Sequence, residues 1–228
     1  MTLPVLIAGA GPVGLVAAAA LHRQGIPVTV LEAEAALPME LRASTFHAPT
    51  LDMLDDLGAA RPLIAQGLVA PHLQYRNRDH SLIAGFDFGI IADLTRHPYR
   101  VQVEQFRLTR ILADRLAGRP GFALRFGATL ADATDLGDRV RVTLVDGETL
   151  DGAWLIGADG AHSAVRRAAG IDFAGFTWPE RFLVLSTPFD FAAAIPGLAD
   201  VSYYADPEEW FFLLRVPGLW RAMFPVRP

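Results

Sequence analysis

The 228-residue sequence lacks two amino acids entirely. It has no cysteine, which excludes disulfides, thiolate nucleophiles, iron–sulfur clusters and cysteine-ligated zinc. It has no lysine either, because all 20 basic residues are arginine. Schiff-base catalysis and a phosphate-binding loop that ends in Gly-Lys-Ser/Thr are therefore excluded.

The basic residues are fewer than the acidic ones, 20 against 25. The net charge is −5 and the isoelectric point about 5.6, which argues against nucleic acid as a partner. Residues 3–21 carry no charge, yet glycine and proline interrupt them and no basic residue precedes them. We interpret them as a buried strand, a turn and a helix. No membrane partner or targeting segment is expected, and the cytoplasm is the expected location.

The sequence contains no motif of a histidine-ligated metal site or of a serine hydrolase. The six histidines show neither His-x-His nor His-Glu-x-x-His spacing, so no metal site is expected. No serine stands in a Gly-x-Ser-x-Gly setting, which leaves hydrolase chemistry unsupported. With 52% hydrophobic residues, the chain is nevertheless rich enough in apolar side chains to form a core.

Hydrophobic patterning predicts a chain of alternating strands and helices. Residues 5–8 and 28–31 are short apolar runs typical of buried parallel strands, and residues 13–24 between them form a helix that ends at Gly25. Further helices are predicted at residues 50–57, 105–116 and 163–169, with Thr50 and Ser163 as N-caps. A hairpin is predicted within residues 71–97, and strands at 140–145, 153–156 and beyond 182.

A Gly-x-Gly-x-x-Gly motif, formed by Gly9, Gly11 and Gly14, stands between the first strand and the first helix. In this setting the glycines allow a tight turn, the approach of a pyrophosphate and close packing of helix on strand. The N-terminus of the helix that follows Pro12 offers N–H donors to phosphates. Glu32 ends the second strand, where a carboxylate accepts hydrogen bonds from ribose hydroxyls and disfavours a 2′-phosphate. This site alone does not separate NAD from FAD.

A second motif, Gly-Ala-Asp-Gly-Ala-His-Ser-Ala-Val-Arg-Arg at residues 157–167, resembles the internal Asp-Gly motif of single-component FAD-dependent aromatic hydroxylases. These flavoprotein monooxygenases are related to para-hydroxybenzoate and phenol hydroxylases. The segments at residues 41–43, 50–58 and 104–110 resemble the same family. The resemblance covers most of residues 1–178, and it is specific for the superfamily rather than for a substrate.

The resemblance implies a role for each matching position. The three glycines, with Pro12, would hold the FAD pyrophosphate, and Glu32 the adenosine ribose. The remaining expected cofactor-binding residues are Arg42, Gln105, Asp159, Gly160 and Arg166. Arg42 would approach the FAD phosphates, Gln105 the ribityl or pyrophosphate portion, and Asp159 would position FAD and the NAD(P)H donor. Three structural alternatives stay open: a solvated Arg42, a helix-capping Gln105, and an Asp159 that only makes a turn.

The aromatic segment after residue 200 lies where the family's substrate sheet would be. Tyr204 is a weak candidate for a hydrogen bond to a phenol, and Arg215 for a substrate carboxylate; the alternative for both is ordinary sheet structure. No catalytic residue is otherwise assigned, because the cofactor carries the chemistry.

The expected fold is α/β: a Rossmann-like FAD-binding domain, residues 1–70 and 98–178, interleaved with a β-rich substrate region, residues 71–97 and 179–228. The expected function is hydroxylation of a small phenolic substrate with NAD(P)H and O₂. The family's downstream Gly-Asp-Ala-Ala-His motif has no match, so we interpret the chain as an N-terminal portion. A C-terminal half or a second chain would complete the flavin site. The alternatives are another flavoprotein oxidoreductase of this superfamily or a non-catalytic dinucleotide-binding module.

Overall fold

The computed structural model describes residues 2–39 and 43–226, which belong to two units. The first unit comprises Met1–Leu41 and Gln105–Gly175, and the second Arg42–Glu104 and Phe176–Pro228. These boundaries differ from those expected at residues 70–71 and 97–98. A small sheet pairs residues 45–46, 68–70 and 100–102 with one another, and Ala70 of that sheet packs against Val201 and Leu214 of the second unit. The functional assignment of each unit stays a prediction.

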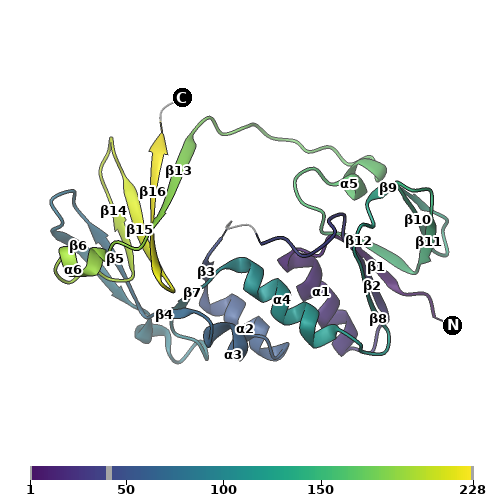
Figure 1. The fold of residues 1–228 in the computed structure, drawn as a ribbon, viewed down its shortest axis with the longest axis horizontal. Coiled ribbons are helices and arrows are strands. Elements are labelled where there is room, and N and C mark those ends of the chain that lie inside the picture. The colour runs from purple at the N-terminus through teal and green to yellow at the C-terminus, as the bar shows by residue number, and fades with distance from the viewer. Residues whose placement is uncertain (1, 40–42, 227–228) are drawn as a thin grey trace. The chain divides into compact units, whose positions relative to one another are not determined.

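The first unit is built on a parallel sheet (Figure 1). Its elements are β1 (Val5–Ala8), α1 (Pro12–Arg23), β2 (Val28–Leu31), α4 (Gln105–Leu116), β8 (Phe122–Arg125), β9 (Leu130–Asp135), β10 (Val140–Leu144), β11 (Thr149–Gly152), β12 (Trp154–Gly157) and α5 (Ala164–Ala168). The parallel sheet has the order β12-β1-β2-β8, and β9, β10 and β11 form an antiparallel sheet.

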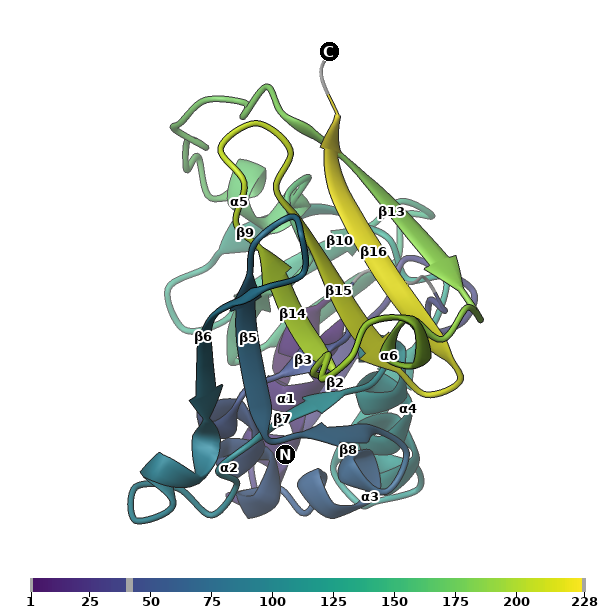
Figure 2. The same ribbon diagram turned by 90° about the vertical axis from the view of Figure 1, so that its left-hand side faces the viewer.

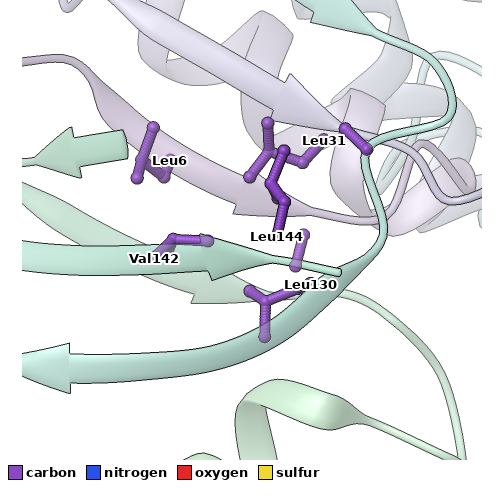
Figure 3. Close-up of a cluster of buried hydrophobic side chains, with 7 residues drawn as sticks. Leu6, Leu31, Leu130, Val142 and Leu144 are labelled. Atoms are coloured by element: carbon purple, nitrogen blue, oxygen red, sulfur yellow. The ribbon is translucent and has the colours of Figure 1, made fainter. Parts of the chain in front are cut away.

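The two faces of the parallel sheet are covered differently. Helix α1 packs on β1, β2 and α4, while Leu6 and Leu31 turn toward the antiparallel sheet. Figure 3 shows how these leucines meet Leu130, Val142 and Leu144, all of which are buried. The predicted strands at 5–8 and 28–31 and the helix at 105–116 are confirmed with the same bounds.

The second unit contains a larger, mixed sheet with the order β13-β16-β15-β14-β5-β6 (Figure 2). Its elements are β3 (Thr45–Phe46), α2 (Ala48–Asp56), α3 (Ala60–Ile64), β4 (Leu68–Ala70), β5 (His72–Arg76), β6 (Leu82–Asp87), the 3₁₀ helix η1 (Phe88–Ile91), β7 (Arg100–Gln102), β13 (Arg181–Thr187), α6 (Phe191–Ala194), β14 (Val201–Tyr204), β15 (Phe211–Val216) and β16 (Leu219–Val226). The predicted hairpin within 71–97 is confirmed as β5 and β6.

Helix α2 begins earlier than predicted. Its N-cap is His47 rather than Thr50, and Pro49 occupies its first turn, where a missing N–H costs nothing. Thr50 therefore lies inside the helix. Within the described residues, every helix is too short or too polar to cross a lipid bilayer.

Opposite faces of the six-stranded sheet carry separate cores. Tyr204, Leu213 and Trp220 pack with Ile195, next to α6, on one face. Val201 and Leu214 pack with Ala70 of β4 on the other. We call the first the α6 face and the second the β4 face.

A buried ion pair ties the segment after β7 to β16. Arg221 Nη2 donates to Glu104 Oε1 at 2.7 Å, and the two side chains are only 6% and 14% exposed. Because removing one partner would leave the other charge buried and unpaired, Glu104→Ala is expected to lower the free energy of unfolding by about 3–5 kcal/mol.

Urea denaturation measures this loss. The matched control is Glu209→Ala, which breaks the exposed pair with Arg78 and should cost less than about 1 kcal/mol. Equal losses in the two variants would show that the buried pair does not hold the second unit together.

Candidate functional site

The turn at residues 9–14, called here the glycine turn, joins β1 to α1 and depends on two of its glycines. Gly9 has φ +99°, and a Cβ there would lie 2.5 Å from the Ala158 carbonyl oxygen. A Cβ on Gly14 would lie 1.9 Å from the Gly9 carbonyl oxygen. Gly11 differs, because its φ of −67° suits any residue and a Cβ there would meet nothing within 4 Å. Gly9 and Gly14 thus allow backbone segments to pack closely, whereas Gly11 leaves open space at the start of α1.

Glu32 ties the glycine turn to the end of β2. The residue is 8% exposed, and its carboxylate Oε2 accepts from the Ala10 N–H at 2.7 Å while Oε1 accepts from the Glu34 N–H at 3.0 Å. Two charge-assisted hydrogen bonds compensate for its burial. Each oxygen keeps a further lone pair, so the carboxylate can still accept from a ribose hydroxyl.

Asp159 follows β12 and caps helix α5. Its Oδ1 accepts from the Ser163 hydroxyl at 2.6 Å, and its Oδ2 from the Ala164 N–H at 2.7 Å. Partial burial raises the pKa of Asp159, but the hydrogen bond from Ser163 and those from backbone N–H groups outweigh burial and hold the pKa below its ordinary value. The predicted cap by Ser163 is confirmed, because its Oγ accepts from the Arg166 N–H at 2.9 Å.

The loops after β1, β2 and β12 converge. The Gly9 N–H donates to the Leu31 carbonyl at 2.7 Å, and the Ala158 N–H to the Ala8 carbonyl at 2.8 Å. A Cβ on Gly9 would also lie 3.2 Å from the Asp159 Cα. Two motifs almost 150 residues apart in the sequence therefore share one edge of the parallel sheet.

The other expected cofactor residues are less closely joined to this edge. Gln105 is the first residue of α4 and half-buried, and Gly160 has φ +77°. The Arg166 side chain contacts the loop that precedes its own helix. Its Nη1 donates to the Ala161 carbonyl at 2.8 Å, and its guanidinium lies 4.7 Å from the Phe173 ring centroid. Arg42 lies outside the described residues.

The structure places Tyr204 and Arg215 on the α6 face. Tyr204 is 1% exposed, its hydroxyl is 2.9 Å from His80 Nδ1, and burial raises the pKa of its phenol. Arg215 stands 5.8 Å over the Trp220 ring, with Nη1 3.4 Å from Asp200 Oδ1. The burial of Tyr204 leaves little of its side chain for a substrate to contact, and the expected role of Arg215 stays a prediction.

The β4 face instead carries a row of partly exposed rings, which sequence reasoning missed. Tyr75 stacks on Tyr203 with centroids 5.4 Å apart, and Phe86 and Phe212 meet these rings edge-on. Met223 is the register partner of Phe212 on β16. We call these four rings, together with the Met223 side chain, the aromatic row. In the sequence, the row could have been predicted only from the alternation of side chains along a strand, which places Tyr203 and Tyr204 on opposite faces of the sheet.

Comparisons with known proteins agree on one family. The family described as "FAD binding domain" matches residues 2–226. The chain is 38% identical over 231 residues to 6-hydroxy-3-succinoylpyridine 3-monooxygenase HspB of Pseudomonas putida, covering 98% of this chain and 58% of that protein. It is 30% identical over 225 residues to para-nitrophenol 4-monooxygenase of Pseudomonas sp. (strain WBC-3), covering 96% of this chain and 55% of that protein.

A solved structure gives the same result. The crystal structure of p-nitrophenol 4-monooxygenase PnpA from Pseudomonas putida superposes with a TM-score of 0.91 and 28% identity. The match covers 100% of this chain and 58% of that one. The chain thus spans little more than half the length of the relatives it matches.

The glycine turn predicts opposite outcomes for two similar substitutions. Gly14→Ala places a methyl group 1.9 Å from a carbonyl oxygen and is expected to cost more than about 3 kcal/mol of unfolding free energy. Gly11→Ala fills open space and should leave stability unchanged or raise it by up to about 1 kcal/mol. Thermal unfolding compares them, and a Gly14→Ala variant as stable as Gly11→Ala would contradict the packing described here.

The Asp159 cap predicts a change in acid stability. Since the folded-state pKa lies below the ordinary 3.8, ionised Asp159 stabilises the fold above that value, and its contribution is lost as the pH falls below it. Asp159→Ala should cost about 1 kcal/mol at pH 7 and flatten the decline below pH 4, as measured by urea denaturation at several pH values. An unchanged acid profile would show that the cap contributes nothing.

Proposed function

The chain belongs to the FAD binding domain family, and from that premise we propose that it is the N-terminal part of an FAD-dependent monooxygenase. The reaction is hydroxylation of a small phenolic ring with NAD(P)H and O₂. The two closely matching relatives are named monooxygenases of a nitrophenol and of a hydroxylated pyridine. We expect the reaction in the cytoplasm, where NAD(P)H is available.

The observation that carries the proposal is the convergence of the glycine turn, Glu32 and Asp159 at one sheet edge. The residues present fit an FAD molecule there. Open space at Gly11 admits a pyrophosphate to the N–H groups of α1, whose first turn contains no acidic residue. Glu32 offers lone pairs to a ribose.

Each remaining residue has a proposed task. Asp159 and Gly160 form the loop against the glycine turn and position the cofactor, together with Gln105, Arg42 and Arg166. When bound, FAD supplies the redox chemistry, accepting reducing equivalents from NAD(P)H and delivering one oxygen atom of O₂ to the ring. The protein's own share is to hold the cofactor, orient the aromatic ring and exclude water.

We place the aromatic substrate on the β4 face, over the aromatic row. Tyr203, Phe212 and Met223 are half-buried, so they present apolar surface and are held by packing. Flat side chains with few rotatable bonds suit a planar ligand. This proposal replaces Tyr204 and Arg215 as the substrate contacts.

We further propose that a C-terminal half, continuous or as a second chain, completes the flavin site. The relatives are almost twice as long as the aligned part. Edge strand β13 supports this, because Phe182, Leu183, Val184 and Leu185 are between 44% and 54% exposed on both of its faces. An exposed apolar edge strand is usually buried against another part of the protein or another chain.

Calorimetric titration with ADP and with FAD tests the cofactor site. The wild-type chain is expected to bind both. Gly11→Ala is expected to fold, because its methyl group fills open space, and to bind both at least about tenfold more weakly, because that methyl group stands in the path of the pyrophosphate. Riboflavin, which lacks the pyrophosphate, is the matched ligand control and should not distinguish the two proteins. A wild-type chain that binds neither ADP nor FAD would contradict the proposed cofactor site.

A further inference from the structure

Tyr204 is a buried tyrosine whose hydroxyl meets an imidazole. The residue is 1% exposed, and its hydroxyl oxygen lies 2.9 Å from His80 Nδ1. Burial raises the pKa of the phenol, so the group keeps its proton at neutral pH. Among the described residues, which include all four tyrosines and all six histidines, no other tyrosine hydroxyl lies within hydrogen-bond distance of an imidazole.

His80 is placed to receive a proton and to pass one on. Its ring meets the Tyr204 ring edge-on at 5.5 Å, and the residue is exposed, so the imidazole reaches both the buried hydroxyl and the solvent. In the tautomer that carries hydrogen on Nε2, Nδ1 accepts the hydrogen bond that the phenol donates. Such an imidazole can take up a proton on one nitrogen and release another from the second.

The Tyr204 ring lies in an apolar aromatic stack. It stacks on Phe211 with centroids 4.2 Å apart and an interplanar angle of 10°, and Phe211 stacks on Phe224 at 5.4 Å. Trp220 belongs to the same core, but the Arg215 guanidinium stands over its ring, and a cation opposes removal of an electron from an indole. A tyrosine that loses its proton together with an electron leaves no positive charge on its ring.

Tyr203 is the natural comparison, because it precedes Tyr204 and lies on the opposite face of the sheet. Its hydroxyl accepts a hydrogen bond from Arg100 Nη1 at 3.3 Å. A guanidinium takes up no proton, and its positive charge opposes removal of an electron from the phenol. Of these two adjacent tyrosines, therefore, Tyr204 alone has a base that can receive its proton.

We propose that Tyr204 is a redox-active tyrosine, which one-electron oxidants such as hydroxyl or peroxyl radicals convert to a neutral tyrosyl radical. The oxidant gains one electron. The O–H bond of Tyr204 breaks, its proton passes to His80 Nδ1, and the Nε2 proton of His80 leaves for solvent. An external one-electron reductant, such as a thiolate, and a proton from solvent restore the phenol. The inference does not depend on the proposed function.

Two features of the chain give this site its use. The sequence contains no cysteine, so no thiol of its own competes for the oxidant. The Tyr204 ring is buried among apolar side chains, so a radical formed there is kept away from solvent and from other protein molecules. The pair of Tyr204 and His80 would therefore hold an oxidising equivalent until a soluble reductant removes it.

Flash photolysis of the full chain tests the proposal. A soluble ruthenium polypyridyl complex with persulfate generates the oxidant at about pH 8, where a free imidazole is mostly neutral. Electron paramagnetic resonance of freeze-quenched samples, with ring-deuterated tyrosine as the reference, is expected to show a long-lived tyrosyl radical. Tyr204→Phe, which keeps the stacked ring and removes only the hydroxyl, should lose this signal. The matched control, Tyr203→Phe, should keep it.

A second set of variants tests the imidazole as the proton acceptor. His80→Asn, whose amide takes up no proton, should slow radical formation at least about a hundredfold, the lower end of what a positioned general base contributes. His80→Gly suits the left-handed backbone there, φ +69°, and added imidazole should restore the radical in this variant but not in His80→Asn. His72→Gln, at an exposed histidine of β5 next to Asp87, should behave like the wild type.

Circular dichroism checks that each variant is folded. The inference is overturned if the wild-type chain forms no long-lived tyrosyl radical, or if the radical survives in Tyr204→Phe or disappears in Tyr203→Phe. Radical formation as fast in His80→Asn as in the wild type would contradict the proton transfer. So would a folded His80→Gly variant that added imidazole does not restore.

Discussion

The close approach of the β12 loop to the glycine turn is the constraint on which the first unit depends. Backbone hydrogen bonds run from Gly9 to β2 and from Ala158 to β1, and a methyl group on Gly9 or Gly14 would collide with a carbonyl oxygen. The loop after β12 and the glycine turn are too close for a side chain to lie between them. Glu32 and Asp159 therefore lie at the same edge of the sheet, and each accepts hydrogen bonds from backbone N–H groups. Backbone N–H groups of the fold itself therefore position both carboxylates at this edge.

The two faces of the six-stranded sheet differ in how far their aromatic and polar side chains are buried. On the α6 face, Tyr204 is buried beside His80, and Arg76 is satisfied by the carbonyls of His80 and Gly197 at 2.6 Å each. On the β4 face, the aromatic row is partly exposed and Arg100 keeps a buried N–H without a partner. The α6 face therefore holds polar groups that are buried and satisfied, and the β4 face presents the partly exposed rings.

Local pattern predicted the first unit well and the second unit poorly. The apolar runs at 5–8 and 28–31 and the helix at 105–116 have periodicities strong enough to fix their bounds. Strands β3 and β7 are two and three residues long, too short to show a period, so the small sheet that shifts the unit boundaries was missed. Tyr203 and Tyr204 are chemically identical neighbours, and only strand register, which long-range pairing sets, decides which one is exposed. The Gly-x-Gly-x-x-Gly motif and its place between strand and helix identified the glycine turn and Glu32, and the family resemblance identified Asp159.

The measurement that tests the central claim most directly is an ADP titration of the ¹⁵N-labelled chain followed by NMR. The account predicts that the amide resonances that shift most belong to Ala10, Gly11, Glu32 and Asp159, on three separate loops, with small changes across the six-stranded sheet. Shifts confined to other residues, or none at saturating ADP, would contradict the assignment of this sheet edge to the cofactor.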